Sequence, residues 1–292
     1  MRFRVPLAAA VLLAVVGGVT PAAAAKPVGS DGVRIVGTAD GFSAPTETRP
    51  GWTTFNVTTS NDDGIRLGLF QLKPGRTLDE FLVGLRTALT EHGTAAAVAG
   101  RQVEASALLL GGAVAAPGRA VTFQRPLTPG TYLLVDYLRV DRSNPINVHK
   151  LTVRGRPSGT APSTACAALA MVDTTDGPRY AGPAVLRSGQ TVLITNRTKQ
   201  LAEAIFVPVR PGTTRADVQR TFETIEAGGW PSDSPLIGLP QGAPVLSAGR
   251  TQVLTPNLAP GSYVLTTWMV DLGNGRMQAA QGMHTLITVV AD

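Results

Sequence analysis

The chain contains an internal repeat, and this repeat limits the possible folds more than any other feature of the sequence. Leu72-Lys-Pro-Gly-Arg-Thr77 in the first half corresponds to Val209-Arg-Pro-Gly-Thr-Thr214 in the second. Farther along, Leu127-Thr-Pro-Gly-Thr-Tyr132 corresponds to Leu258-Ala-Pro-Gly-Ser-Tyr263. Because the order and the spacing of these motifs agree along both halves, the sequence predicts two copies of one structural unit.

Each copy contains a segment with helical periodicity after its first Pro-Gly turn. Thr77 with Glu80, and Thr214 with Asp217, have the spacing of a capping box, in which threonine and acid each satisfy a backbone N–H at a helix N-terminus. Apolar residues then follow at helical spacing: Leu78, Phe81, Leu82, Leu85 and Leu89 in the first half, and Val218, Phe222 and Ile225 in the second. The pattern predicts one inserted helix in each half.

The other segments of each copy have strand character and are separated by turn signals. Gly51 and Gly189 open the strands that we expect over residues 52–58 and 190–196. Each half ends in a short apolar strand, over residues 148–153 and 283–290. About seven short strands per half, with Pro-Gly turns between them, are typical of a two-sheet sandwich. We therefore predict an all-β fold of two tandem antiparallel Greek-key β-sandwiches, each with one inserted helix.

A stretch rich in Gly, Pro and Ser separates the two copies, over Arg154 to Ser163. Such a composition is typical of a flexible linker. We predict a first domain over residues 31–155, a linker over 156–163 and a second domain over 164–292. Each domain is expected to pack around its own core.

The N-terminus has the features of a secretory signal peptide over residues 1–25. Arg2 and Arg4 precede a short apolar stretch, and four alanines at 22–25 provide the small residues that a signal peptidase requires. Later segments do not reach the roughly 18 consecutive apolar residues of a membrane span. We predict a secreted, extracellular protein without stable membrane insertion, whose mature chain begins at Ala25 or Lys26.

Charge and cysteine content exclude several classes of protein. The formal net charge is +6, without a run of basic residues, so nucleic-acid binding is not expected. A single cysteine excludes an intramolecular disulfide and a structural zinc site of the Cys₄ or Cys₂His₂ type. Cys166 is either a thiol open to intermolecular chemistry or a small buried residue of a strand over 164–172, and we favour the buried position.

Several motifs together resemble tandem cupredoxin-like domains of secreted actinobacterial proteins. These motifs are a proline before the Gly-led strand, Asn196 at a strand end, the Leu-x-Pro-Gly-x-Tyr turn, and the closing Gly282-Met283 followed by Ile287. The resemblance covers residues 33–154 and 164–290. It implies the fold already expected from the turns and strands.

Copper-binding members of that family hold one copper ion with a His, a Cys, a second His and often a Met. The four positions fall near Glu203, Thr267, Gln278 and Met283 in the second half. In the first half the corresponding positions fall near Arg66, Asp136 and Asn147 or Val148. Only Met283 matches, so the resemblance implies domains without the type 1 copper ligands, and we predict no cofactor.

A second possible metal site consists of sulfur and imidazole groups near the C-terminus: Met269, Met277, Met283 and His284. Thioethers with an imidazole are suitable ligands for Cu(I). The alternative, which we favour, is that Met269 and Met283 are core residues, Met277 belongs to a loop and His284 lies on a strand surface.

Other polar and aromatic residues have structural explanations. His149 has no nucleophile motif beside it, and His92 lies at a helix end beside Gly93, where a cation would favour the helix dipole. Asp62-Asp63 forms an acidic turn with too few oxygen ligands for calcium. Trp230 is either an exposed contact residue or a plug at the top of the sandwich. We assign no catalytic, cofactor-binding or metal-binding residue.

From these observations we predict a secreted, non-catalytic β-sandwich protein, not an enzyme. It would be a binding or structural module at the cell surface or outside the cell, and its partner is an unknown ligand or protein. Two alternatives remain open at this point. One is an extracytoplasmic copper-handling protein that uses the Met/His set, and the other is an enzyme with an inter-domain site.

Overall fold

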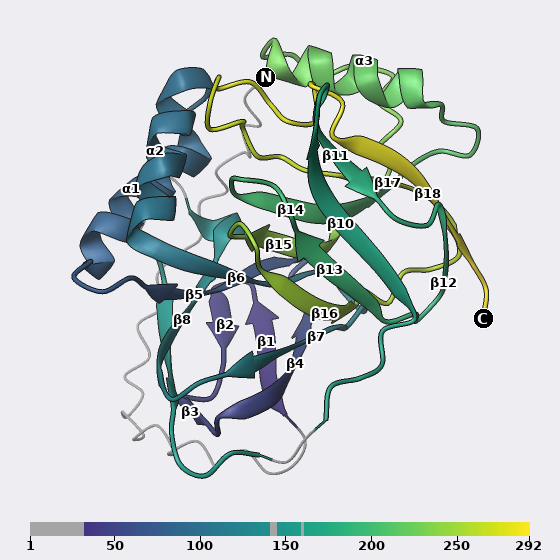
Figure 1. Ribbon diagram of the computed structural model, residues 1–292. Helices are drawn as coiled ribbons and strands as arrows, with labels where there is room; N and C mark the ends of the chain where they lie inside the picture. The colour runs from purple at the N-terminus through teal and green to yellow at the C-terminus, as the bar shows by residue number, and fades with distance from the viewer. Residues whose placement is uncertain (1–31, 141–144, 159–160) are drawn as a thin grey trace, which may run out of the picture.

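The computed structural model describes residues 32–140, 145–158 and 161–292. The predicted signal peptide, residues 1–25, lies outside the described residues. Two large β-sheets pack face to face, and the helices cover the outer face of one of them (Figure 1). The predicted all-β sandwich fold is confirmed.

The first sheet has the strand order β11-β10-β13-β16-β7-β4-β1-β2. Its strands are β1 (Val33–Thr38), β2 (Gly41–Ser43), β4 (Gly51–Thr59), β7 (Val121–Leu127), β10 (Ala167–Thr174), β11 (Gly177–Ala181), β13 (Val192–Asn196) and β16 (Thr251–Thr255). Most neighbours are antiparallel, but β1 with β4 and β10 with β13 are parallel.

The second sheet has the strand order β12-β18-β17-β14-β15-β6-β5-β8-β9-β3. Its strands are β3 (Glu47–Thr48), β5 (Ile65–Leu72), β6 (Ala107–Ala115), β8 (Gly130–Asp136), β9 (Val148–Val153), β12 (Val185–Arg187), β14 (Ala202–Pro208), β15 (Gln241–Leu246), β17 (Gly261–Thr266) and β18 (His284–Val290). The short edge strands β3 and β12 pair in parallel with β9 and β18.

Both sheets run without a break through the two halves of the chain. In each sheet the strand order of the second half mirrors that of the first, and corresponding strands pair at the junction, β7 with β16 and β6 with β15. At one junction Phe123 pairs with Leu254, and at the other Val114 pairs with Gly242. Antiparallel pairing of the same element from two copies is the geometry of an isologous dimer interface.

The expectation of a separate core for each half is therefore wrong. One hydrophobic core between the sheets contains side chains from both halves, among them Phe55, Phe123, Phe206 and Leu254. Pairing of corresponding strands leaves neither junction with an exposed sheet edge, and exposed edges are open to unwanted association. The limits of the two domains, 31–155 and 164–292, remain a prediction.

The repeat extends to a special backbone conformation at two glycines. Gly112 in β6 and Gly242 in β15 both have positive φ, +143° and +142°. A Cβ atom would lie 2.0 Å from the carbonyl oxygen of Leu67 at the first position and 2.3 Å from that of Ala204 at the second. Only glycine permits this approach, so the same irregularity is built into both copies.

The predicted capping boxes are both present. Thr77 caps α1 (Leu78–Thr90) together with Glu80, and Thr214 caps α3 (Arg215–Glu226) together with Asp217. The first half also contains α2 (Gly93–Ser106), so its described residues form two helices where the sequence predicted one. This segment is rich in alanine, and the small side chains of Ala96, Ala97 and Ala99 make its buried face hard to recognise from periodicity.

Two smaller cores lie between the second sheet and the helices. Under α1 and α2, the ring of Phe81 stacks on Phe70 with centroids 4.2 Å apart. Under α3, Val218 and Phe222 pack with Val264 of β17. Helices therefore cover parts of the outer face of this sheet, and strands there are buried on both sides. Between β8 and β9, the 3₁₀ turn η1 (Tyr137–Arg139) follows directly after β8.

Candidate functional site

Two of the four ligand positions implied by the family resemblance meet in the second half. Ile205 of β14 pairs with Thr266 of β17, which places Glu203 beside the residues that follow β17. One carboxylate oxygen of Glu203, Oε1, accepts a hydrogen bond from the Trp268 N–H at 2.5 Å and one from the Thr267 hydroxyl at 3.4 Å. Glu203 and Thr267 are both buried.

Gln278 holds the next ligand position and ties two segments together. Its side-chain Nε2 donates to the carbonyl oxygens of Leu201 at 3.3 Å and Val270 at 3.2 Å. Its Oε1 is buried and has no hydrogen-bond partner among the described residues. The backbone N–H of Met283 donates to the Gln278 carbonyl at 2.9 Å, while the Met283 side chain belongs to the core between the sheets.

This set of donors does not fit a type 1 copper ion. Such a site requires a thiolate and imidazoles, and Glu203, Thr267 and Gln278 provide a carboxylate, a hydroxyl and an amide. The Thr267 oxygen also accepts the Met269 N–H at 3.0 Å while its hydroxyl donates to Glu203. The carboxylate of Glu203 and the hydroxyl of Thr267 are therefore used on one another and on the backbone, whereas Gln278 Oε1 has no hydrogen-bond partner among the described residues.

The structure does not bring the Met/His set together. Met283 lies in the core between the sheets, Met269 packs beneath α1 and α2, and Met277 packs beneath α3. His284 is only 2% exposed, so the expectation that it lies on a strand surface is wrong. Within the ranges that the structure describes, no three His, Cys, Asp or Glu side chains are grouped for a metal ion.

His284 is buried because α3 covers the outer face of β17 and β18. It pairs across the strands with Thr266, stacks near Phe222 at 6.0 Å, and shares a hydrogen bond of 2.8 Å with Gln219 of α3 through Nε2. Burial, and then the positive charges of Arg215 and Arg179, lower the pKa of His284 to about 4. The imidazole is therefore neutral near pH 7.

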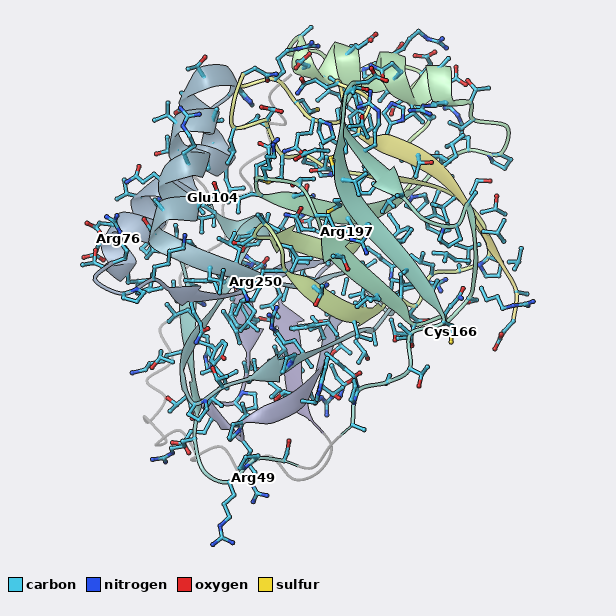
Figure 2. The ribbon with its side chains drawn as sticks, viewed as in Figure 1. Arg49, Arg76, Glu104, Cys166, Arg197 and Arg250 are labelled. Atoms are coloured by element: carbon cyan, nitrogen blue, oxygen red, sulfur yellow. The ribbon has the colours of Figure 1, made fainter. Side chains whose placement is uncertain are left out.

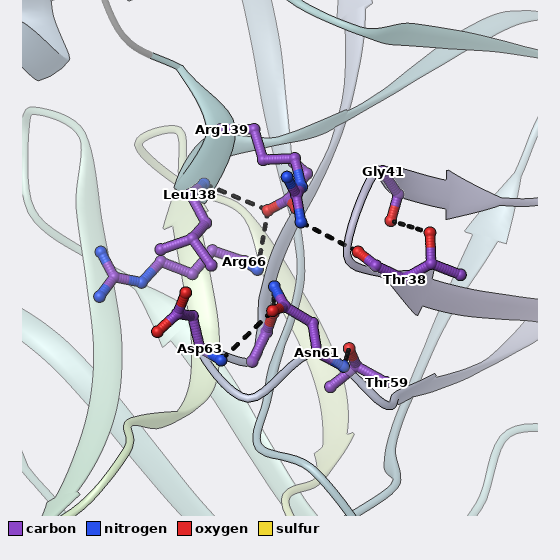
Figure 3. A network of polar contacts seen from close by, with 10 residues as sticks. Thr38, Gly41, Thr59, Asn61, Asp63, Arg66, Leu138 and Arg139 are labelled. Carbon is purple, nitrogen blue, oxygen red and sulfur yellow. Dashed lines mark hydrogen bonds and ion pairs between the residues drawn. The ribbon is translucent and has the colours of Figure 1, made fainter. Parts of the chain in front are cut away.

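The corresponding position of the first half also contains a buried carboxylate, but on the opposite strand. Asp136, at the end of β8, accepts hydrogen bonds from the backbone N–H groups of Arg66 and Leu138, both at 3.1 Å, and lies 3.6 Å from the Arg139 guanidinium (Figure 3). Burial raises the pKa of Asp136, while these N–H groups and the arginines act against that rise.

The two carboxylate sites approach each other across the junction. The positive charge of Arg66, in the first half, acts on Glu203, in the second, but burial is the larger effect and raises the Glu203 pKa. Tyr137 lies against Gly68, where a Cβ atom would be 2.1 Å from the hydroxyl oxygen. The Tyr180 hydroxyl donates to the Glu203 carbonyl at 2.6 Å. This polar cluster, which we define as Arg66, Tyr137, Tyr180, Glu203 and Thr267, brings polar groups from both halves near the Glu203 carboxylate.

Two further sequence expectations are corrected by the structure, and the alternative left open for Trp230 is decided. Cys166 is exposed and lies just before β10, so its predicted burial is wrong (Figure 2). His92 is the N-cap of α2, at the positive end of that helix dipole, so the dipole does not favour a cation there. Trp230 is 51% exposed, which excludes its role as a plug of the sandwich.

The remaining candidates take the structural places expected of them. Half-buried His149 lies with its Nε2 3.0 Å from the carbonyl oxygen of Pro45. The acidic turn at Asp62-Asp63 is closed by Asn61, whose side-chain oxygen accepts the Asp63 N–H (Figure 3). The Nδ2 of Asn61 donates to the Gly64 carbonyl.

A cleft of about 370 Å³ lies beside α3, and sequence reasoning missed it. Its walls come from the turn at residues 210–213, from one side of α3 and from residues 231–235 of the following loop. Each of these segments had a sufficient structural explanation by itself. The one signal for the cleft was the Trp230-Pro-Ser-Asp-Ser-Pro235 motif, whose exposed tryptophan adjoins the wall.

No family model and no curated protein matches the chain. Solved structures that resemble it include an auracyanin from Roseiflexus castenholzii, with 19% identity over 42% of this chain and 94% of that one, at a TM-score of 0.26. A multicopper oxidase covers 88% of both chains at 14% identity and a TM-score of 0.24. The blue copper oxidase of Nitrosomonas europaea covers 87% of this chain and 76% of its own, at 13% identity and a TM-score of 0.23.

These neighbours are cupredoxins and multicopper oxidases, as the sequence motifs led us to expect of the fold. The prediction that this protein is not an enzyme is contradicted by them, because the neighbours that span most of the chain are oxidases. Their copper and their reactions are properties of those proteins. Among the described residues, no helix is long and apolar enough to cross a membrane.

Proposed function

We propose that this protein is an exported, cupredoxin-like binding module in which the copper-ligand positions of the second half have become a structural joint between β14 and the segment after β17. The leader-like residues 1–25 support export, and the continuous sheets support a rigid body that presents loops on its surface. Its binding partner is a component outside the cytoplasm.

The observation that carries this proposal is the hydrogen bonding of Glu203. A buried carboxylate is costly unless its oxygens are satisfied. Here one oxygen receives the Trp268 N–H and the Thr267 hydroxyl, and the Tyr180 hydroxyl binds the carbonyl of the same residue. These contacts join β14 to the segment after β17. The thiolate position is held by Thr267, whose hydroxyl is bonded to Glu203.

The copper part of the proposal is tested by visible absorption after addition of Cu(II). Wild-type protein should show no intense blue band, because the position that would carry the thiolate is Thr267. The matched variant combines Glu203→His, Thr267→Cys and Gln278→His and keeps Met283. A new intense band in this variant alone would support our placement of the ligand positions. An intense band in the wild-type protein would overturn the proposal.

The binding part is tested by sedimentation with insoluble cell-envelope material from the source organism. The mature chain should sediment with the envelope and remain bound at moderate salt, whereas serum albumin should stay in the supernatant. If the mature chain stays in the supernatant as albumin does, the proposed function fails.

A further inference from the structure

We infer that the cleft beside α3 binds a neutral carbohydrate, one or two pyranose rings of a glycan. This inference rests on the proposed binding function and adds its site and its class of ligand. The cleft has a volume of about 370 Å³, within the range of small-molecule sites. Its lining is mainly polar, in contrast to the apolar grooves that receive helices or peptides.

The charges of the lining favour a neutral ligand over an anion. Arg210 and Arg220 provide guanidinium donors, and Asp217 and Asp233 provide an equal number of carboxylates. Arg220 is paired with Asp217, and Arg210 donates to the backbone carbonyl of Asp233. A phosphate or sulfate group would therefore meet two carboxylates, whereas the hydroxyl groups of a sugar can donate to carboxylates and accept from guanidinium groups.

The cleft also has acceptors that are free to bind hydroxyl groups. The Asp233 carboxylate makes no hydrogen bond or ion pair within the described residues. The backbone around it is held by hydrogen bonds to the carbonyl oxygens of Asp233, Pro231 and Pro235. The hydroxyls of Thr213, Thr221 and Thr224 donate to backbone carbonyls and keep lone pairs for further bonds. The lining therefore offers both donors and acceptors to the hydroxyl groups of a pyranose ring.

An exposed aromatic residue directly precedes the wall of the cleft in the chain. Trp230 is 51% exposed, and the next residue, Pro231, belongs to the wall of the cleft. An indole face and a proline ring provide flat apolar surface, which suits the C–H face of a sugar ring.

The walls are fixed before any ligand binds. The Arg210 N–H donates to the Pro235 carbonyl at 3.0 Å, and the Ile237 N–H donates to the Pro208 carbonyl at 3.0 Å, which join the loop to the end of β14. The capping box of Thr214 and Asp217 fixes the start of α3 beside them. A site held in place in this way loses little conformational entropy on binding.

The test is a binding assay on immobilised oligosaccharides. The panel contains neutral glycans (cellotetraose, chitotetraose, mannotetraose and an arabinan fragment) and two charged probes, a heparin tetrasaccharide and mannose 6-phosphate. Wild-type protein should bind at least one neutral glycan in preference to the charged probes. Asp233→Asn and Trp230→Ala should each weaken that binding by roughly tenfold. Val83→Ala, at a side chain that is 62% exposed on α1 in the other half, is the control and should bind as wild type does.

Three results would overturn the inference. They are no binding to any neutral glycan at millimolar concentration, a preference for the charged probes, and neutral-glycan binding that both cleft variants retain in full. Asp233 and Trp230 are exposed, so both variants should fold as the wild-type protein does. Thermal melting of each variant checks this. Envelope sedimentation separates this failure from that of the proposed function. If the wild-type protein and both variants still sediment with the envelope, the proposed binding function is retained and the assignment of the cleft as its site is rejected.

Discussion

Where β8 and β17 end, each half satisfies backbone N–H groups with polar side chains, but the two halves use different residues. In the first half, Asp136 accepts the Leu138 N–H two residues ahead and the Arg66 N–H across the strands. In the second half these tasks are divided. Thr267 accepts the Met269 N–H two residues ahead, and Glu203, on the facing strand, accepts the Trp268 N–H. In both halves a buried carboxylate joins the end of one strand to the facing strand, but the carboxylate lies on opposite strands of the pair.

This comparison shows what the repeat keeps. The turns, the helix caps and the backbone irregularity at Gly112 and Gly242 occur in both copies, because the backbone allows few alternatives there. The polar groups that end the strands differ, because a hydroxyl, an aspartate or a glutamate can each satisfy the same N–H groups. Function in the two halves therefore cannot be inferred from the repeat itself.

The largest expected effect tests whether the two halves can unfold independently of each other. Phe123 pairs with Leu254 at the junction and stacks on Phe55 with ring centroids 4.4 Å apart. Phe123→Ala should lower the free energy of unfolding by about 3–5 kcal/mol. Because the core is shared, the loss should appear equally in both halves. Guanidinium unfolding followed by fluorescence at Trp52 and, separately, at Trp268 measures this.

The control for that experiment is Val83→Ala, which should change the stability by less than about 0.5 kcal/mol. Single-tryptophan variants assign each signal to one half. Two transitions at different denaturant concentrations would restore the model of independent domains, whereas coincident transitions are expected of one cooperative unit.

The next effect is a pH dependence of stability that arises in the second half, where α3 covers His284. The pKa of this imidazole falls from its usual 6.5 to about 4 on folding, so the unfolded chain binds more protons between these values. Stability should therefore be complete above pH 6.5 and be lost as the pH falls toward 4, by about 3 kcal/mol in total. Urea unfolding at a series of pH values in wild type and His284→Gln checks this.

In His284→Gln the loss between pH 6.5 and 4 should be smaller, because the titrating group is gone. His149→Gln is the matched control for the loss of a histidine side chain, since His149 is half-buried and lies in the first half. Equal slopes in wild type and His284→Gln would contradict the burial of a neutral imidazole under α3.

Glu203 should act in the opposite direction. Burial raises its pKa in the folded protein, so the folded chain binds the extra proton and the contribution to stability is present below the unfolded pKa. That contribution is lost as the pH rises through the folded pKa. Glu203→Gln keeps an acceptor for the Trp268 N–H but cannot ionise. Its stability relative to wild type should therefore increase with pH over this range, as pH-dependent urea unfolding would show.

Asp136→Asn is the companion variant in the first half. The folded pKa of Asp136 is also raised by burial, so its relative stability should change with pH in the same direction. If Glu203→Gln instead becomes less stable relative to wild type as the pH rises, the Glu203 carboxylate is stabilised by its surroundings, and its position in the cluster must be revised.

Short-range features of this fold could be predicted from the sequence, whereas pairings between distant segments could not. The capping boxes at Thr77 and Thr214 depend on residues three positions apart. The pairing of Phe123 with Leu254 joins strands far apart in the chain, and each strand is equally suited to an edge of its own sandwich. His284 was misplaced for a related reason. A strand covered on both faces by other elements does not show a polar face by alternation.

The candidate sites show the same limit. The resemblance to cupredoxin-like domains implied ligand positions near Glu203 and Thr267, and the contact of these residues follows from the pairing of β14 with β17. The cleft beside α3 was missed because Arg210, Asp217 and Asp233 come from three segments that each had a structural explanation. Cys166 was misplaced by a strand boundary, since β10 begins one residue later, at Ala167.

The smallest expected effect compares the two tyrosines of the repeated Pro-Gly turns. Both rings are buried, and both hydroxyls reach the backbone four residues earlier, but in opposite senses. The Tyr132 hydroxyl accepts the Thr128 N–H at 3.0 Å, whereas the Tyr263 hydroxyl donates to the Ala259 carbonyl at 2.9 Å. Each Tyr→Phe change should cost about 0.5–1.5 kcal/mol.

Within that range, Tyr132→Phe should cost more than Tyr263→Phe. The first change leaves a backbone N–H without its acceptor, and orphaned N–H groups are tolerated less well than carbonyls, which have a second lone pair. The double variant should equal the sum of the two, because the residues lie in different halves without a shared hydrogen bond. Equilibrium urea unfolding of the two single variants and the double variant measures these differences. A larger loss of stability for Tyr263→Phe would contradict this ranking. It would show that these two hydrogen bonds do not determine the contribution of each turn to stability.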